Sequence, residues 1–485
     1  MPEFTCNFTQ PAQTLGHHWE HTVGSGHAPL ALRADWQAQM RRCRSELGFR
    51  HVRFHALLSG EMETLLVEED QFLYSFFNAD QIIDFLLSIG VRPFVELSFM
   101  SEALASGTTT VFRYAANVTP PKDMAQWSTL IRKLVTHWVD RYGVQEVRGW
   151  FFEVWNEPNL PAFWTGSQAE YFDLYRATAA TIKTVDALLQ VGGPATADNA
   201  WITEFLDFCA TGHVPVDFIS THHYPTDAFG HIGADTVTQL EHSPPGKMRE
   251  DAVRVRAQAR GLPVYYTEWS TSSNPRDPLH DEPFTAALAV KIAMEANGLV
   301  EGYSYWTFSD IFAENYFPSL PFQGGFGLLT IHAIAKPAYR AFELLHRLGT
   351  ELLPVAETHA TVSAWVVRKG RTATALLVNH AMPRHPIHTE LVTLRLAGAP
   401  EPCAVYVERI DEDHANPRRL WEAMGKPRYL DVRAVEALKR GSALVQEPHP
   451  WAYTPANLDL AIALPPTASP RSRWSLLEPA RRIQR

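Results

Sequence analysis

The chain has 485 residues and a formal net charge of −10, with 46% hydrophobic and 20% charged residues. This length exceeds one ordinary domain but fits one large domain plus one small one, with an ample core. The acidic balance, without a long basic cluster, argues against nucleic acid or an anionic membrane as the main partner. No apolar run approaches the ~18 residues that a membrane span needs.

The cysteines and the first residues of the sequence indicate the cellular compartment in which we expect the protein. The four cysteines are far apart and form neither a CxxC motif nor a Cys/His zinc spacing: Cys6, Cys43, Cys209 and Cys403. The opening "MPEFTCNFTQPAQ" has neither the basic nor the apolar region of a signal peptide. We therefore expect reduced thiols in a cytoplasmic protein, with the periplasm as the alternative.

Residues 15–348 alternate between β-rich runs and helical segments. In "QIIDFLLSIG" (81–90), for example, an apolar helical face ends at a glycine, and the β-rich "RPFVELSF" follows. Eight β-rich runs occur, at 15–24, 51–59, 92–99, 150–158, 189–196, 217–225, 263–270 and 302–310. Eight βα units predict an α/β fold, a (β/α)8 TIM barrel. An open doubly wound sheet is the alternative, but no glycine-rich phosphate loop follows any run.

The pattern changes after residue 348. Runs such as "TVSAWVVRKG" (361–370) and "RTATALLVNHA" (371–381) are joined by short polar turns. They predict an accessory antiparallel β-sandwich over 349–485, to which residues 1–14 add. We expect a helical insertion near 411–445 and a basic, frayed tail that begins at "PRSRW" (470–474).

Two of the barrel runs end in glutamate. Glu157 closes the fourth run and Glu268 lies near the end of the seventh, 111 residues later. A TIM barrel has its active site at the carboxyl ends of its strands. Two carboxylates across that mouth suit glycoside hydrolysis, and a retaining mechanism needs them about 5–5.5 Å apart. The alternative is a pair of structural carboxylates in buried ion pairs.

The surroundings of the two glutamates predict different roles. Glu157 follows the apolar "WFFEVW", and apolar surroundings raise the pKa of a carboxyl, which suits a general acid. Glu268 follows Tyr265, Tyr266 and Thr267, whose hydroxyl groups are candidate donors that keep a nucleophile ionised.

Four motifs together resemble glycoside hydrolase family 39: "WFFEVWNEPN", "YYTEWSTS", "YWTFSDIFAE" and "GGFGLL". The resemblance covers nearly the whole chain and implies a retaining (β/α)8 glycosidase, chiefly a β-xylosidase or an α-L-iduronidase. It implies that Glu157 is the acid/base and Glu268 the nucleophile. Asn156 then hydrogen-bonds the 2-hydroxyl of the sugar, and Tyr224 hydrogen-bonds the nucleophile.

The resemblance also implies sugar contacts. His222 binds sugar hydroxyls, His55 touches the non-reducing sugar, Trp306 forms an apolar floor and Glu314 accepts hydrogen bonds from outer hydroxyls. His222 and His223 are adjacent, so in a strand they point to opposite faces; we assign His222 to the mouth and His223 to packing.

Each site residue has a plainer alternative. His55 is equally well explained as a core histidine and Trp306 as barrel filling. A His–Glu cluster is also a metal motif, but no helical i, i+4 His pair is present, so we expect no metal and no cofactor. Less favoured candidates are Glu96, Glu153, Asp310, His17 and His18.

The identity of the sugar is the least constrained inference. Iduronidase-like members carry a Lys where this chain has Tyr224, and loop 310–327 contains no Lys or Arg, which favours a neutral sugar. Four aromatic residues are candidates to close the pocket around a pentose: Phe99, Trp306, Phe322 and Phe326. Ala313 and Gln323 depart from the family pattern in what we expect to be the sugar-binding shell.

We therefore predict an exo-acting β-xylosidase on xylo-oligosaccharides. The alternatives are an iduronidase, arabinosidase or glucosidase of the same fold, or a non-catalytic sugar-binding barrel. The sequence leaves the oligomeric state open.

Overall fold

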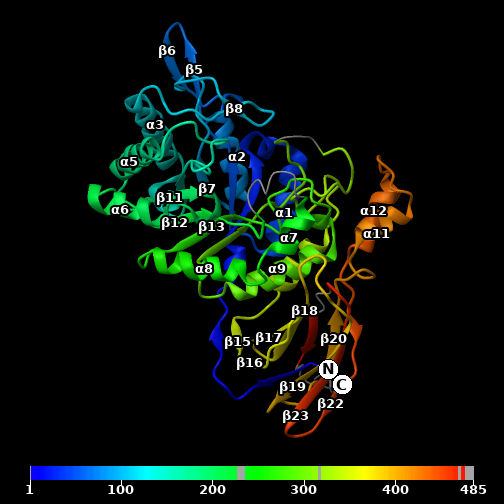
Figure 1. Ribbon diagram of the computed structural model, residues 1–485. Coiled ribbons are helices and arrows are strands. Elements are labelled where there is room, and N and C mark those ends of the chain that lie inside the picture. Colours follow the sequence, from blue (N-terminus) through cyan, green and yellow to red (C-terminus); the bar gives the residue numbers. More distant parts are fainter. Residues whose placement is uncertain (1, 227–234, 315–317, 468–470, 476–485) are drawn as a thin grey trace, which may run out of the picture.

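The computed structural model describes residues 2–226, 235–314, 318–467 and 471–475. Eight parallel strands close into a barrel in the order β10-β11-β12-β13-β14-β3-β4-β7 (Figure 1), which confirms the TIM fold. These strands are β3 (Thr22–His27), β4 (His51–His55), β7 (Arg92–Leu97), β10 (Phe151–Val154), β11 (Gln190–Thr196), β12 (Phe218–His222), β13 (Val264–Trp269) and β14 (Gly302–Tyr305).

Helices surround the barrel and begin where the sequence offers caps. Asp123 accepts two backbone N–H bonds at the start of α3, and Ser167 with Glu170 forms a capping box at α5. The surrounding helices are α1 (Ala34–Leu47), α2 (Phe77–Ser88), α3 (Met124–Tyr142), α5 (Gln168–Val185), α6 (Ile202–Gly212), α8 (Lys247–Gln258), α9 (Pro283–Glu295) and α10 (Pro337–His346).

Shorter elements decorate the connections. They are the helices α4 (Val144–Val147) and α7 (Thr236–His242) and two hairpins, β5 (Leu65–Glu68) with β6 (Gln71–Tyr74) and β8 (Thr110–Val111) with β9 (Ala116–Asn117). The β5–β6 hairpin projects from the barrel at the top of Figure 1. It follows β4, so it lies on the side of the barrel mouth.

The first barrel strand begins later than the sequence predicts. A 3-10 turn occupies His18–Glu20, and β3 starts only at Thr22. His17 and His18 therefore precede the strand and lie at the amino end of the barrel, opposite the mouth. His17 contacts Glu20 at 2.7 Å and the carbonyl of Gly349 at 3.0 Å. Both histidines were wrong as site candidates.

An aromatic layer closes the amino end of the barrel. Phe94, Phe151, Phe218 and Tyr265 form one buried cluster, in which the rings of Phe94 and Phe151 stack at 5.0 Å. Because side chains alternate along a strand, the residues two positions further on also point inward. That next layer is polar, with Glu96, Glu153, Ser220 and Thr267, and it lies directly beneath the mouth.

The accessory region is a two-sheet sandwich below the barrel. One sheet has the order β16-β1-β19-β23-β22 and the other β2-β15-β17-β18-β24-β20-β21. The strands of the first sheet are β16 (Val355–Ala356), β1 (Glu3–Asn7), β19 (Glu390–Ala397), β23 (Asn457–Leu464) and β22 (Ala452–Tyr453). The strands of the second sheet are β2 (Gln13–Thr14), β15 (Glu351–Leu353), β17 (Val362–Lys369), β18 (Thr372–Asn379), β24 (Arg471–Ser475), β20 (Ala404–Glu408) and β21 (Glu447–Pro448). A separate core that includes Phe4, Val366 and Leu394 fills the space between the sheets.

The sandwich differs in two features from the prediction, which was an antiparallel sandwich followed by a frayed tail. Strand β1 pairs with β19 in parallel, so the first residues do add to this sheet. Arg471–Ser475 forms β24 between β18 and β20, where the sequence predicted the start of a frayed tail. Four of its five residues are polar, so the sequence did not show the apolar pattern that indicates a buried strand. Residues 476–485 lie outside the described residues.

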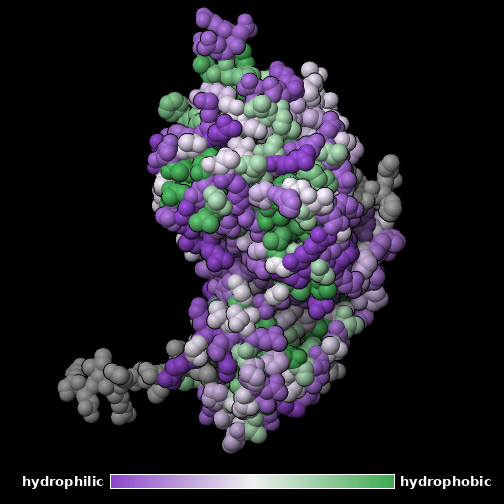
Figure 2. Space-filling model, turned by 90° about the vertical axis from the view of Figure 1, so that its left-hand side faces the viewer, coloured by the Kyte–Doolittle hydropathy of each residue, from purple (hydrophilic) through white to green (hydrophobic). Residues whose placement is uncertain are grey.

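The expected insertion contains two helices, α11 (Pro417–Ala423) and α12 (Val432–Gly441), on the flank of the barrel. Seen from the side, the barrel and the sandwich form two lobes, with hydrophilic side chains over both and apolar ones in separate patches (Figure 2). Among the described helices, none has the length and apolar character needed to cross a membrane.

Candidate active site

A cavity of about 810 Å³ lies at the carboxyl ends of the barrel strands. The structure brings seven of the eight predicted site residues to its lining: His55, Asn156, Glu157, Tyr224, Glu268, Trp306 and Glu314. The eighth, His222, lies directly behind Glu157 and is fully buried. Residues from five different strand ends, those of β4, β10, β12, β13 and β14, thus meet at one mouth.

The backbone around Glu157 turns sharply to reach this cavity. Strand β10 ends at Val154, and Trp155 and Glu157 have φ of 72° and 45°, in the left-handed region that non-glycine residues avoid. Such strain persists where surrounding contacts hold it, and it concentrates at functional sites. The Glu157 amide is held by the carbonyl of Ala195 at 2.8 Å.

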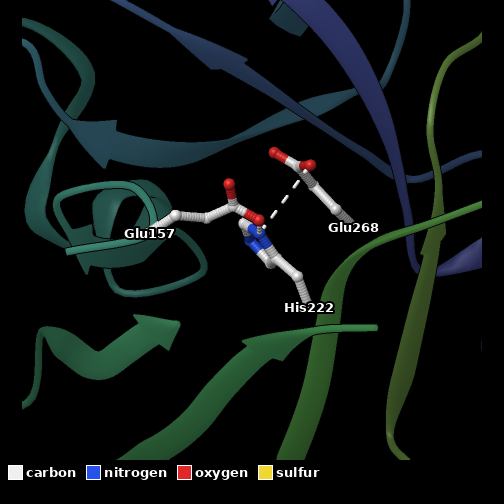
Figure 3. Close-up of side chains that lie close together, drawn as sticks. All are labelled: Glu157, His222 and Glu268. Carbon is white, nitrogen blue, oxygen red and sulfur yellow. Dashed lines mark hydrogen bonds and ion pairs between the residues drawn. The ribbon is translucent and has the colours of Figure 1, made fainter. Parts of the chain in front are cut away.

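The carboxyl of Glu157 is almost completely enclosed. His222 Nδ1 lies 2.9 Å from Glu157 Oε1 (Figure 3). Burial raises the pKa of Glu157 to about 7, because the ionised form loses its hydration. Near pH 7 a substantial share of the Glu157 carboxyl groups is therefore protonated, and the direction of the shift is the one that the sequence predicted from the apolar strand.

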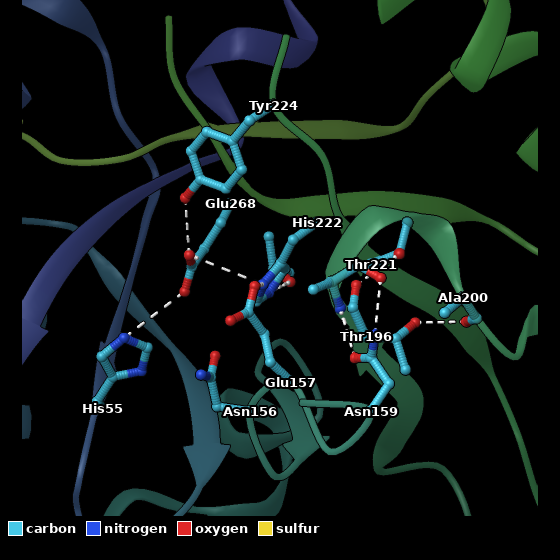
Figure 4. A network of polar contacts seen from close by, with 12 residues as sticks. His55, Asn156, Glu157, Asn159, Thr196, Ala200, Thr221, His222, Tyr224 and Glu268 are labelled. Carbon is cyan, nitrogen blue, oxygen red and sulfur yellow. Dashed lines mark hydrogen bonds and ion pairs between the residues drawn. The ribbon is translucent and has the colours of Figure 1, made fainter. Parts of the chain in front are cut away.

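Glu268 receives different partners. Arg53 Nη1 donates to Oε1 at 2.7 Å. The Tyr224 hydroxyl donates to Oε2 at 2.9 Å (Figure 4). His55 Nε2 lies 3.6 Å from the same carboxylate. Charge-assisted hydrogen bonds of this kind are short and strong, and they fix the position of the carboxylate.

The predicted donors to Glu268 were wrong. Tyr265 belongs to the aromatic layer at the amino end, and Tyr266 stacks on His223 outside the barrel at 3.8 Å. Thr267 donates to Glu153 instead, at 2.8 Å. A strand alternates its faces, so residues next to Glu268 in sequence are not its neighbours in space.

His223 takes the packing position that the sequence assigned to it. Its Nε2 contacts the Tyr303 hydroxyl at 2.5 Å, and its Nδ1 lies 3.6 Å from Asp251 on α8. His222, its neighbour, points into the barrel interior, but it lies behind Glu157 and outside the cavity lining, and both of its ring nitrogens have protein partners. The predicted contact of His222 with sugar hydroxyls was therefore wrong. The two adjacent histidines therefore lie on opposite faces of the chain, as predicted.

The inner end of the cavity is apolar on one side and acidic on the other. Trp306, Phe312 and Phe326 form one buried cluster, of which Trp306 and Phe326 line the cavity. Burial raises the pKa of Glu314 to about 8, so its carboxyl is mostly neutral at pH 7, a form that offers one donor as well as acceptor oxygens. Burial lowers the pKa of His55, but the Glu96 carboxylate at 2.7 Å and the Glu268 carboxylate together raise it to about 9.

Two of the four aromatic candidates lie elsewhere. Phe99 packs behind the cavity, 5.7 Å from Trp155, and Phe322 packs 5.5 Å from Trp421 of α11. The departures Ala313 and Gln323 also fall outside the cavity lining that the structure describes. Gln323 Oε1 accepts from the Ser319 amide at 2.8 Å, so it serves its own loop rather than the sugar.

The outer part of the cavity is wider and polar. It is lined by the start of α7, by residues 273–278 and by Arg384 from the loop between β18 and β19. Arg276 and Arg384 bring two exposed arginines, both from outside the 310–327 window. Arg384 pairs with Glu241 at 2.7 Å, so the sandwich contributes to the rim.

One oxygen each of Glu157 and Glu268 and one nitrogen of His222 lie within 4.8 Å of one another. That spacing would also suit a shared metal ion. His222 Nδ1, however, is at hydrogen-bond distance from Glu157, which engages the lone pair that a metal would need. The absence of a metal stays a prediction.

Comparison with known proteins agrees with this geometry. The model for "Glycosyl hydrolases family 39" matches residues 5–456. The chain belongs to this family. It is 47% identical over 460 residues to a beta-xylosidase of Caldicellulosiruptor saccharolyticus, covering 94% of each chain. A monomeric beta-xylosidase from Caulobacter crescentus CB15 superposes with a TM-score of 0.86 at 33% identity, over 99% of this chain and 100% of that one.

A human alpha-L-iduronidase is also similar, at 24% identity over 78% of this chain and 63% of its own length. The family therefore includes relatives with different sugars. Membership of family 39 therefore does not identify the sugar, which has to be inferred from the residues of the pocket.

Sequence reasoning missed Arg53, which organises the family 39 site. Its guanidinium is fully buried and donates to Glu153 at 2.6 Å, to Glu268 at 2.7 Å and to Asn156 at 2.9 Å. It also pairs with Glu96 at 2.8 Å. The signal was present, because Arg53 stands two residues before His55 in one strand and so shares its face.

Phe112 and Phe163 were missed as well. Both line the cavity from loops, the first after β7 and the second after β10. Loop residues carry no periodic signal that could reveal where their side chains point.

Proposed function

We propose that this chain is a retaining exo-β-xylosidase that releases xylose from the non-reducing end of xylo-oligosaccharides. Glu268 attacks the anomeric carbon while Glu157 protonates the leaving oxygen, and a covalent xylosyl–Glu268 intermediate forms. Glu157 then takes a proton from water, which attacks the anomeric carbon and restores Glu268. The net result is hydrolysis with retention.

The observation that carries this proposal is the spacing of the two carboxyl groups. Oxygens of Glu157 and Glu268 approach within 4.8 Å. A retaining enzyme places its carboxyl groups about 5–5.5 Å apart, whereas an inverting one leaves about 6.5–9.5 Å for a water. The different partners of the two groups support different roles, with Glu157 as acid and Glu268 as nucleophile.

The pocket supports a neutral pentose. Trp306 and Phe326 wall its inner end, and the two arginines of the lining are exposed at the rim. The cavity volume of about 810 Å³ is near the upper end for small-molecule sites, so it has room beyond one sugar. The beta-xylosidases among the relatives support the same substrate class.

We also propose that the enzyme works in the cytoplasm on imported oligosaccharides, which agrees with a structure that records no disulfide among its cysteines. This proposal is independent of the chemistry.

A panel of aryl glycosides tests the substrate. We expect 4-nitrophenyl β-xyloside to be cleaved with a kcat/KM at least about tenfold above the β-glucoside, because the glucoside adds a hydroxymethyl group against the aromatic wall. The α-L-arabinoside is expected as a slower side substrate. A faster rate on the glucoside or the iduronide would reject the assignment, and activity that survives EDTA dialysis would support a metal-free reaction.

A further inference from the structure

Beneath the cavity, a chain of buried hydrogen bonds leads to Glu157. The Thr267 hydroxyl donates to Glu153 Oε1 at 2.8 Å. Thr267 Oγ1 lies 3.1 Å from His222 Nε2, and His222 Nδ1 lies 2.9 Å from Glu157 Oε1. All four side chains are buried, so water does not supply alternative partners freely.

The partners fix the direction of the first two bonds. Glu153 Oε2 accepts from Arg53 Nε at 2.6 Å in a buried ion pair, so Glu153 acts as an acceptor. Thr267 has a single hydroxyl proton, and it is given to Glu153. The contact between Thr267 and His222 therefore requires the Nε2–H of His222 as donor.

The direction of the last bond follows from the charge of His222. Burial lowers the pKa of His222 to about 4, so the imidazole is neutral at pH 7. A neutral imidazole carries one N–H, and here it is on Nε2. Nδ1 then presents a lone pair, and its 2.9 Å contact is a hydrogen bond only when Glu157 carries the proton.

We propose that the chain Glu153–Thr267–His222 fixes the histidine tautomer and thereby keeps Glu157 protonated, with Thr267 as a positioning residue. This inference rests on the proposed role of Glu157 as general acid. An ionised Glu157 faces the lone pair of Nδ1, which disfavours the loss of its proton. After Glu157 has protonated the leaving group, the same lone pair favours the return of a proton from the attacking water.

Other charged and titratable groups also face Glu157 and His222. Cations on β4 favour the ionised carboxyl, whereas the acidic groups on β7, β10, β13 and after β14 favour the neutral one. They are His55, Arg53, Glu96, Glu153, Glu268 and Glu314, with Tyr224 bonded to Glu268. A substitution at Thr267 removes none of these charges, although it also takes the Thr267 hydroxyl away from Glu153, which keeps its ion pair with Arg53.

Thr267→Val and Thr267→Ser make a matched pair. Valine keeps the shape but offers no acceptor to Nε2–H, so His222 is free to protonate at Nδ1 and donate to an ionised Glu157. We expect the alkaline limb of kcat/KM on 4-nitrophenyl β-xyloside to move down by about one pH unit, a tenfold change in proton affinity that one hydrogen bond can supply. Thr267→Ser keeps the hydroxyl and is expected to leave the limb in place.

Thr271→Val is the control for a buried threonine of the same segment. Its hydroxyl lies 3.3 Å from Thr285 Oγ1, away from Glu157, so the limb should not move. If folded Thr267→Val keeps the alkaline limb of kcat/KM at the wild-type pH, the proposal is overturned. It is also overturned if Thr267→Ser shifts this limb as far as Thr267→Val does.

A second measurement needs no Thr267 variant and no turnover. Long-range ¹H–¹⁵N spectra of histidine-labelled wild-type protein, compared with His222→Gln, identify the His222 ring. We expect the neutral tautomer protonated on Nε2 at pH 7. A ring protonated on Nδ1 or on both nitrogens would reject the chain, whereas failure to cleave any xyloside would reject only the function.

Discussion

The two ends of the barrel interior use the same strands for opposite purposes. At the amino end, Phe94, Phe151, Phe218 and Tyr265 form an aromatic layer. Strands β7 and β10 are in register there, Phe94 with Phe151 and Glu96 with Glu153. Two positions further along β7 and β10, the aromatic layer thus gives way to a layer of charged side chains around Arg53.

The difference teaches how this fold separates stability from chemistry. The aromatic layer gains free energy simply by leaving water. The charged layer costs desolvation and is tolerated because Arg53 contacts four acceptors at once. We therefore expect substitutions at the mouth to change activity far more than stability. Substitutions in the aromatic layer are expected to change stability far more than activity.

The largest effect is expected from Glu268→Ala. Loss of the nucleophile should lower kcat by about four orders of magnitude or more, because the covalent route disappears. Added azide should restore turnover and give the inverted glycosyl azide. Glu268→Gln is the matched control: it keeps the shape and should be equally inactive but unrescued. Full activity of the alanine variant would contradict the assignment.

Glu157→Gln comes next. Substrates with poor leaving groups should lose about 10²–10⁴-fold in kcat/KM, since a general acid supplies that much. In the wild type the burial of Glu157 raises its pKa to about 7, so activity should fall as pH rises through 7 and the acid loses its proton. The variant should lack this alkaline limb. A wild-type limb that persists in Glu157→Gln would assign it to another group.

Tyr224→Phe tests the contact from the rim to the nucleophile. The lost hydroxyl donates to Glu268 at 2.9 Å, and a hydrogen bond to a charged group is worth about 1.5–3 kcal/mol, or roughly 10–100-fold in kcat/KM. Tyr303→Phe, outside the barrel, is the control and should stay near wild type. Equal effects of the two changes would remove the special role of Tyr224.

Phe151→Ala should have the smallest effect on activity and the largest on stability. Truncation of this ring in the amino-end layer should cost about 3–5 kcal/mol of unfolding free energy, because it leaves a cavity. At 25 °C, kcat/KM should stay within about twofold, since the charged layer above is unchanged. Phe151→Leu should cost less. A large loss of kcat without loss of stability would show that the two layers are coupled.

The sequence was informative where periodicity and strand ends carry the signal. Glu157 and Glu268 lie together as expected, because carboxylates at strand ends converge in a barrel, while their catalytic roles stay a prediction. His222 and His223 were assigned to opposite faces by alternation alone. Arg53 was missed although the same alternation places it beside His55. The donors to Glu268 were wrong because neighbours in sequence point to opposite faces.

Loops set the limit of sequence reasoning. Phe112, Phe163 and Arg384 line the cavity, and Phe99 and Phe322 do not, yet no pattern distinguishes them. Strand β24 was mistaken for the start of a loose tail because a short strand rich in arginine looks like one. Such positions are fixed by long-range packing, which a local pattern does not record.

Covalent trapping tests the central claim, that the charged mouth performs a double displacement through Glu268. The wild-type protein is incubated with 2,4-dinitrophenyl 2-deoxy-2-fluoro-β-xyloside, and its peptides are analysed by mass spectrometry. We predict stoichiometric labelling of the peptide that contains Glu268, with the fluoroxylosyl group on its carboxylate. A label on Glu157, or complete absence of label in an enzyme that cleaves xylosides, would contradict it.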